Sequence, residues 1–197
     1  ELDQLLKCID LLPSMEEIQY RAQEISNDKR WKIFPLYAYG NKMEVNEKRF
    51  PHTTDALRKI PHMRAAMFSI IQAKKSIPPH VGPYAGVLRY HLGVKVPANN
   101  QCGITLGEDT AYWEEGKSLI FDDSQLHHAW NNSDEDRVIL FVDFTRPLPT
   151  GYAEVNENIL TGYAGSEFMT DAIGQWMHWE AAHGAVIDQY LNVLAQT

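Results

Sequence analysis

Cysteine is scarce in this chain: among 197 residues only Cys8 and Cys102 occur, far apart and outside any CxxC spacing. This excludes a disulfide scaffold and a cysteine zinc cluster, and we expect a reducing, cytoplasmic compartment. Apolar runs are short as well, and none approaches the roughly 20 residues that span a bilayer, so we expect no membrane span. Residues 1–4 lack the basic-then-apolar order with which a signal peptide begins.

Positive charge is also in short supply. Lys and Arg number 18 against 26 Asp and Glu, which gives a formal net charge of −8. A surface of this sign repels phosphate backbones, so nucleic acid is not an expected partner. Hydrophobic residues make up 44% and charged residues 22%, as in ordinary globular proteins. Because no repeat or linker divides them, residues 1–197 are predicted to form a single domain.

The sequence pattern divides this domain into three parts. The N-terminal part, about 1–60, is expected to be helical and then irregular, with a helix over 14–28 that starts at a capping box of Ser14 and Glu17. Residues about 62–147 hold short β-rich runs separated by Pro, Gly and Asn turns, which predicts an antiparallel barrel or jelly roll. Helical spacing returns over about 165–197 and predicts two helices, divided at Gly184.

Two histidines of the β-rich part are candidate metal ligands. His80 lies between a Pro-Pro pair and a Gly-Pro pair, a stiff setting that we expect to fix its ring at the start of a strand. His127 comes just after the strand predicted over 118–121. Two imidazoles brought together from distant strands of a jelly roll form a geometry that suits a metal ion, and iron in particular.

Two arginines are predicted to point into the same interior. In the strand predicted over 87–94, Arg89 and His91 share one face, and apolar residues share the other. Arg137 begins the strand predicted over 137–144 and can enter the same cavity from there. A buried guanidinium is costly without a partner, so the pattern indicates a bound anion. A salt bridge within the protein is the alternative.

The order of these residues is similar to that of a known family. The segment from about 65 to 147 resembles the aspartyl/asparaginyl β-hydroxylases, which are Fe(II)- and 2-oxoglutarate-dependent dioxygenases. The resemblance is carried by the blocks His80-Val81-Gly82-Pro83, Leu88-Arg89-Tyr90-His91-Leu92-Gly93, Trp113-Glu114-Glu115-Gly116-Lys117 and Phe121-Asp122-Asp123-Ser124, with His127 and Arg137. It implies a mainly β fold with flanking α-helices around a double-stranded β-helix, the jelly-roll core that cupins also have.

The resemblance also implies roles for individual residues. The two iron ligands match His80 and His127. The residues that bind 2-oxoglutarate match Arg137 and Ser69 at its distal carboxylate, and Arg89 and His91 near its C1 carboxylate. A dicarboxylate is also the anion that buried arginines would require. The implied cofactors are Fe(II), 2-oxoglutarate and O₂, with ascorbate as a stimulant and with succinate and CO₂ as co-products.

Two positions carry further information about the site. Most non-haem iron oxygenases place a carboxylate two residues after the first histidine, where this chain has Gly82, as the aspartyl/asparaginyl β-hydroxylases do. We expect a water there, held by Asp122 or Asp123; a chloride in its place would indicate a halogenase. Val87 replaces an arginine that binds the acidic side chain of the substrate in peptide-hydroxylating members.

The function predicted from the sequence is hydroxylation of an unactivated C–H bond in an amino acid, an amino-acid derivative or a peptide residue. The alternatives are hydroxylation of a lipid acyl chain, 2-oxoglutarate-dependent halogenation, and a non-catalytic cupin-like sensor. The substrate is expected to be a small molecule or a peptide, and the aromatic residues of the segment 31–50 are expected among the pocket walls. The sequence carries no signal for an oligomeric state.

Overall fold

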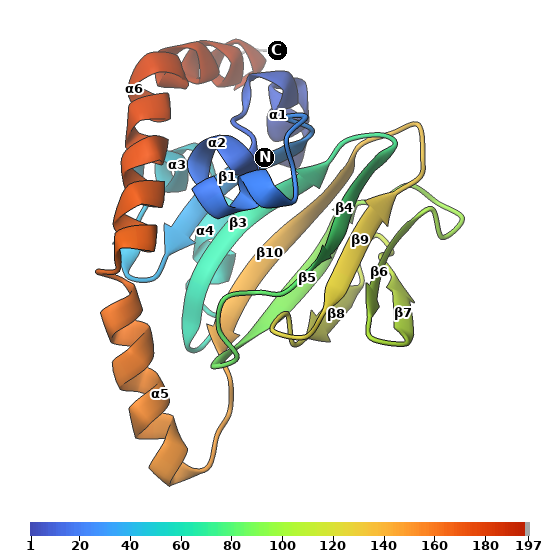
Figure 1. Cartoon of the computed structure of the whole chain (residues 1–197). Coiled ribbons are helices and arrows are strands. Elements are labelled where there is room, and N and C mark those ends of the chain that lie inside the picture. Colours follow the sequence, from blue (N-terminus) through green and yellow to red (C-terminus); the bar gives the residue numbers. More distant parts are fainter. Residues whose placement is uncertain (196–197) are drawn as a thin grey trace.

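Two antiparallel sheets form the centre of the protein in the computed structural model, which describes residues 1–195 and the side chains up to residue 191 (Figure 1). The larger sheet has the strand order β2-β1-β3-β10-β5-β8, and the smaller sheet has the order β4-β9-β6-β7. The strands are β1 (Trp31–Ala38), β2 (Asn41–Lys42), β3 (Met63–Ile71), β4 (Lys75–His80), β5 (Val87–Lys95), β6 (Cys102–Leu106), β7 (Asp109–Tyr112), β8 (Ser118–Phe121), β9 (His127–Asn131) and β10 (Arg137–Thr145).

The eight strands from β3 to β10 make up the core of the fold. Counted from one to eight along the chain, they lie in the order 1-8-3-6 in the larger sheet and 2-7-4-5 in the smaller one. This is the order of a jelly roll built from two Greek keys, so the predicted double-stranded β-helix is confirmed. The sequence pattern does not reveal β4, β7 or β9, whose Pro, His and polar residues hide the strand signal.

The N-terminal part carries a strand that the sequence does not predict. β1 extends the larger sheet beside β3, and its antiparallel pairs run from Trp31 opposite Ile71 to Ala38 opposite Ala65. The prediction of a helical and then irregular segment is wrong here, because the apolar residues of 31–38 pair with a sheet edge that local sequence cannot show. Pro35 is tolerated because the register of the pairing shifts beside it.

Short helices pack around β1 and β3: α1 (Leu2–Lys7), η1 (Ile9–Leu11), α2 (Met15–Ile18), η2 (Tyr20–Glu24), α3 (Glu44–Arg49) and α4 (Pro51–Leu57). The capping box of Ser14 and Glu17 is present, but the continuous helix expected over 14–28 is not. Gln19 is extended, with φ −121° and ψ 109°, and separates α2 from η2. The carboxylate of Glu16 accepts the backbone N–H of Lys29 at 2.6 Å, so the chain turns back within the predicted helix.

Two helices close the described chain, and their boundary differs from the prediction. α5 spans Thr150–Tyr163, and α6 spans Glu167–Ala195 without a break at Gly184. Arg49 accounts for the continuity, since its guanidinium pairs with Glu180 at 2.8 Å and donates to the carbonyl of Gly184 at 3.0 Å. A methyl group at position 184 would collide with the carboxylate of Glu180 and would lie 3.2 Å from Arg49 Nη2, so glycine makes room for this ion pair. In Figure 1, α6 runs along the outside of the molecule and α5 projects beyond it.

Three apolar clusters hold these layers together. One lies between the two sheets and includes Ile71 and Ile139, and a second lies between the larger sheet and the helices and includes Phe34 and Ile187. The third joins α2, β1 and α6 and includes Met15, Ile33 and Trp176. Both cysteines of the chain are buried and free. Within residues 1–195, no helix combines the length and the apolarity that crossing a membrane requires.

Candidate active site

The rings of His80 and His127 lie side by side, with their centroids 4.2 Å apart. His80 is the last residue of β4, not at the start of a strand as expected, and it pairs in register with His127, the first residue of β9. Nδ1 of each ring lies 2.8 Å from a backbone carbonyl, that of Pro78 for His80 and that of Gln125 for His127. A carbonyl can only accept, so each Nδ1 carries the proton and each Nε2 keeps its lone pair.

Both imidazoles are held in the neutral form that a metal ion binds. Burial lowers the pKa of His80, and the neighbouring His127 and Arg89 lower it further. Burial also lowers the pKa of His127. A ring with a lone pair on Nε2 and a carbonyl fixing its Nδ1–H has the arrangement that orients histidine ligands in metal sites. The pair can therefore donate two nitrogen atoms to one ion.

Asp123 fills the space that a side chain at position 82 would need. A methyl group at Gly82 would lie 1.9 Å from Asp123 Oδ2, and the N–H of Gly82 donates to the carbonyl of Asp123 at 2.6 Å. Asp123 is fully buried, whereas Asp122 is held by Ser124 and Arg146. Of the two aspartates expected near the metal, Asp123 is thus the one whose carboxylate lies beside Gly82. No cluster of three or more His, Cys, Asp or Glu side chains spaced for one metal ion occurs among residues 1–195.

Arg89 is paired with two carboxylates of the protein. Its Nε and Nη2 donate to the two oxygens of Asp143 at 2.9 and 3.1 Å. Its Nη1 forms an ion pair with Asp123 Oδ2 at 2.7 Å, at an angle that does not make a hydrogen bond. Burial lowers the pKa of Arg89, but the two aspartates outweigh it and raise the pKa overall. Of the two alternatives from the sequence, this arginine has the salt bridge, and the bridge is buried. The sequence offers one sign that Asp143 belongs to this interior, because it shares a strand face with Arg137.

Arg137, in contrast, has no carboxylate within salt-bridge distance in the described part of the chain. The residue is 2% exposed, and its Nε and Nη1 have no hydrogen-bond partner among the described residues. Its guanidinium lies over the ring of Trp113, 4.5 Å from the ring centroid. Burial lowers the pKa of Arg137 to about 9. A cation this deeply buried is costly unless an anion joins it.

Two further polar groups face the same interior as Arg137. His91 is buried, and neither of its ring nitrogens has a partner among the described residues. Burial, Arg89 and Arg137 lower the pKa of His91 far below its ordinary value, so the ring is neutral. Ser69 stands opposite Ile139, two residues along β10 from Arg137, and its hydroxyl accepts the indole N–H of Trp31 at 3.0 Å. The three side chains together could surround an anion.

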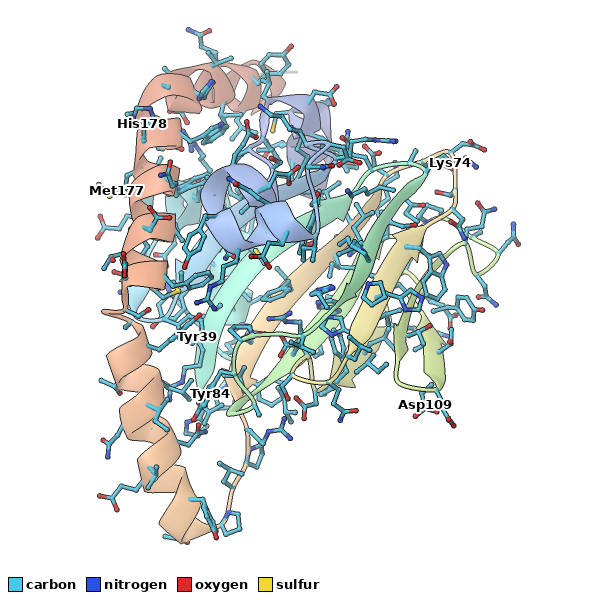
Figure 2. The ribbon with its side chains drawn as sticks, viewed as in Figure 1. Tyr39, Lys74, Tyr84, Asp109, Met177 and His178 are labelled. Atoms are coloured by element: carbon cyan, nitrogen blue, oxygen red, sulfur yellow. The ribbon has the colours of Figure 1, made fainter. Side chains whose placement is uncertain are left out.

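A cavity of about 590 Å³ lies between the larger sheet and the helices α2, η2 and α6. His80, Arg89, Asp123 and Asp143 lie in its wall, while most of the wall is aliphatic, aromatic or methionine. This volume is typical of small-molecule sites. Trp31 and Tyr39 of the segment 31–50 line the cavity as expected. Figure 2 shows Tyr39 between the sheet and the junction of α5 and α6. Met169, Ile173 and Trp176 of α6 line the cavity as well, although helical spacing alone does not tell which side of a helix faces a cavity.

Comparison with known proteins places these residues in a family. The profile described as aspartyl/asparaginyl beta-hydroxylase matches residues 1–147. The ornithine lipid ester-linked acyl 2-hydroxylase of Rhizobium tropici is 40% identical over 193 residues, which is 98% of this chain and 69% of that protein. The human aspartyl/asparaginyl beta-hydroxylase is 36% identical over 122 residues, and the chain spans only 16% of its length.

Among solved structures, a cupin domain from an Enterobacter cloacae transcriptional regulator is similar to 60% of this chain, with 99% of that domain covered, a TM-score of 0.42 and 9% identity. The family profile covers well over half of the chain, and nearly the whole chain matches the bacterial relative, of which it spans 69%. The chain therefore belongs to the aspartyl/asparaginyl β-hydroxylase family and is an enzyme of the hydroxylase class.

Proposed function

We propose that this enzyme is an Fe(II)- and 2-oxoglutarate-dependent hydroxylase and that its substrate presents an acyl chain. The iron and 2-oxoglutarate, when bound, would allow O₂ to oxidise the substrate, with one oxygen atom going to the C–H bond to give an alcohol and the other to succinate, and with CO₂ released. What the chain itself supplies is two neutral imidazoles, an anion site, a largely apolar cavity and the placement of the substrate carbon.

The residues present fit the iron. His80 and His127 would bind it through Nε2, and Asp123, whose carboxylate lies beside Gly82, would hold a water at the position that Gly82 leaves open. The pairing of Asp123 with Arg89 favours this role, because the ion pair fixes the carboxylate in place beside Gly82. The negative charge beside Gly82 also disfavours a chloride there, and with it the halogenase alternative.

The residues present fit 2-oxoglutarate as well. Arg137 would bind the distal carboxylate, with Ser69 beside it, because this guanidinium is buried and lacks an anion. His91 would contact the C1 carboxylate, since its two nitrogens are buried without partners. Arg89 already has two carboxylates, so its contribution is to hold Asp123 in place.

The observation that favours an acyl substrate is the wall of the cavity. Met169, Ile173 and Trp176 of α6 form part of it, and they lie beyond residue 147, where the family profile ends. The match to the acyl 2-hydroxylase spans 193 residues and so includes these helices. Arg89 in this wall is neutralised by Asp123 and Asp143, so it is not free to bind an acidic amino-acid side chain; Arg21, the other arginine of the wall, is exposed to solvent.

The experiment is a comparison of substrate classes under one set of conditions. The intact protein is supplied with Fe(II), 2-oxoglutarate, ascorbate and air, and succinate and the hydroxylated product are measured by mass spectrometry. A detergent-dispersed acyl ester of an aminolipid is compared with free amino acids and with an aspartate-containing peptide. We expect product and succinate in equal amounts only with the acyl substrate.

His80→Ala should abolish turnover, and His128→Ala is its matched control. His128 follows His127 directly, and its ring lies near that of Trp130, with ring centroids 5.4 Å apart. Because neighbouring residues of a strand face opposite sides, its side chain points away from the interior. Turnover of the amino acid or the peptide, and not of the acyl ester, would overturn the choice of substrate; no turnover of any substrate and no binding of 2-oxoglutarate would overturn the dioxygenase itself.

A further inference from the structure

The outer face of α5 carries large apolar side chains that nothing in the described chain covers. Tyr152, Val155 and Ile159 are 70%, 56% and 46% exposed. Their spacing of three and four residues places them along one stripe of the helix. Glu154 and Glu157 lie on the other side of the helix, so this α5 stripe is free of charge.

The α5 stripe leads to the opening of the cavity. Tyr163, four residues after Ile159, continues the stripe and lines the cavity. Asn156 fastens α5 to the segment that follows His80, because its side chain accepts the hydroxyl of Tyr84 at 2.6 Å and donates to the carbonyl of Gly86 at 2.9 Å. Val81 in this segment also lines the cavity and is 59% exposed, so the cavity opens beside α5.

The opposite side of this opening is amphipathic. Tyr20 of η2 is half exposed, and its ring lies 6.1 Å from that of Phe168 at the start of α6. The guanidinium of Arg21, which also lines the cavity, lies 5.5 Å from the ring of Phe168. Tyrosine and arginine side chains with an apolar body and a polar tip are favoured where lipid meets water.

We propose that the α5 stripe and the opening of the cavity rest on the surface of a lipid bilayer, so that an acyl chain enters the cavity without crossing water. This inference rests on the proposed acyl-chain function. Amphipathic helices bind to a bilayer in this way, with the apolar face buried at the boundary between headgroups and acyl chains. A second copy of the chain on this face would cover the opening through which the substrate enters.

The charge of the protein defines which bilayer suits this face. The net charge is −8, and the two carboxylates on the far side of α5 add no positive group that would attract anionic headgroups. Anionic lipids therefore repel the protein, and apolar burial alone drives binding. The partner is a bilayer with neutral or zwitterionic headgroups. The protein should bind it no more weakly when the salt concentration is raised.

The test is flotation of the intact protein with phosphatidylcholine vesicles, without and with a share of phosphatidylglycerol. The double variant Val155→Glu/Ile159→Glu should lose at least about tenfold in partition to phosphatidylcholine, because two side chains that each gain from burial now carry charge. Tyr152→Ser, at the most exposed position, should lose about threefold. Met177→Glu is the matched control: Met177 is 65% exposed and points outward from α6 in Figure 2, so its replacement should leave partition unchanged.

Turnover separates this inference from the proposed function. The double variant should turn over a detergent-dispersed acyl ester like the wild type and lose turnover of the same ester embedded in vesicles. Vesicle binding without turnover of any acyl ester would refute the proposed function and leave the docking surface standing. The docking surface itself is refuted if wild type and double variant partition equally to the vesicles, or if binding requires phosphatidylglycerol. It is also refuted if the wild type is a dimer in solution and the double variant is a monomer.

Discussion

Replacing Arg137 by methionine should stabilise the protein in the absence of 2-oxoglutarate. Burial lowers the pKa of this guanidinium to about 9, which corresponds to a penalty of roughly 5 kcal/mol for the charged form. The contact with Trp113 offsets about 2 kcal/mol of this. A side chain of similar length without charge should therefore raise the free energy of unfolding by on the order of 3 kcal/mol.

The size of this stabilisation depends on pH. The folded-state pKa of Arg137 lies below its unfolded value, so the penalty is present in full at neutral pH and fades as the pH rises through about 9. At pH 7.5, a gain of this size raises Tm by roughly 6–12 °C for a chain of this length. Arg137→Lys keeps the charge and is the matched control, since it should gain no such stability.

Differential scanning fluorimetry measures the Tm of each variant without 2-oxoglutarate and the increase in Tm when the ligand is added. The wild type at a hundredfold excess over Kd should gain about 2.7 kcal/mol, and Arg137→Met should gain nothing from the ligand. A fall of several degrees in the Tm of ligand-free Arg137→Met would refute the reasoning, because it would mean that the guanidinium stabilises the fold by itself.

Three further outcomes are expected. Gly82→Ala forces the carboxylate of Asp123 to move, since the new methyl group would lie 1.9 Å from its oxygen, and should weaken Mn(II) binding by about 10–100-fold in calorimetric titration; an unchanged affinity would contradict the placement of Asp123. The free energy of unfolding should fall by about 1.4 kcal/mol per pH unit below pH 6.5, because the pKa of His91 is lowered in the folded state and its ring takes up a proton only on unfolding. Urea unfolding of His91→Gln should show a shallower dependence on pH. The exposed control His178→Gln should keep the pH dependence of the wild type. Ser14→Ala removes the capping box beside the cavity and should lower the unfolding free energy by about 1 kcal/mol, visible as a lower urea midpoint with an unchanged m-value.

The core of the fold could be predicted from the sequence because its strands alternate and its turns are marked. The runs 87–94, 118–121 and 137–144 correspond to β5, β8 and β10. β1 could not be predicted in this way, because its pairing with β3 depends on an edge formed by residues 27 to 40 positions further along the chain. The break at Gln19 and the continuity through Gly184 have the same origin: contacts of Glu16 and Arg49 with distant residues override local helical preference.

The sequence predicts which residues lie in the candidate site, but it does not predict which of them pair with one another. Strand alternation correctly put Arg89 and Arg137 on interior faces, yet it gave both the same expectation of an anion. The structure separates them, because Asp143 lies opposite Arg89 in the β5–β10 register, whereas Arg137 lies opposite Ile71 in the β3–β10 register. Which arginine finds a carboxylate depends on strand register, and one sequence does not specify a register before the strands are paired.

The cavity wall and the histidine pair come from parts of the chain that can change independently. His80 and His127 are fastened within the smaller sheet by carbonyls only two residues away from each of them, whereas α6 reaches the cavity from outside both sheets. Exchanging residues of α5 and α6 would therefore alter the shape of the chamber without disturbing the donor atoms. One barrel could serve many substrates in this way, and directed evolution of new hydroxylation specificities should begin with the helices after residue 147.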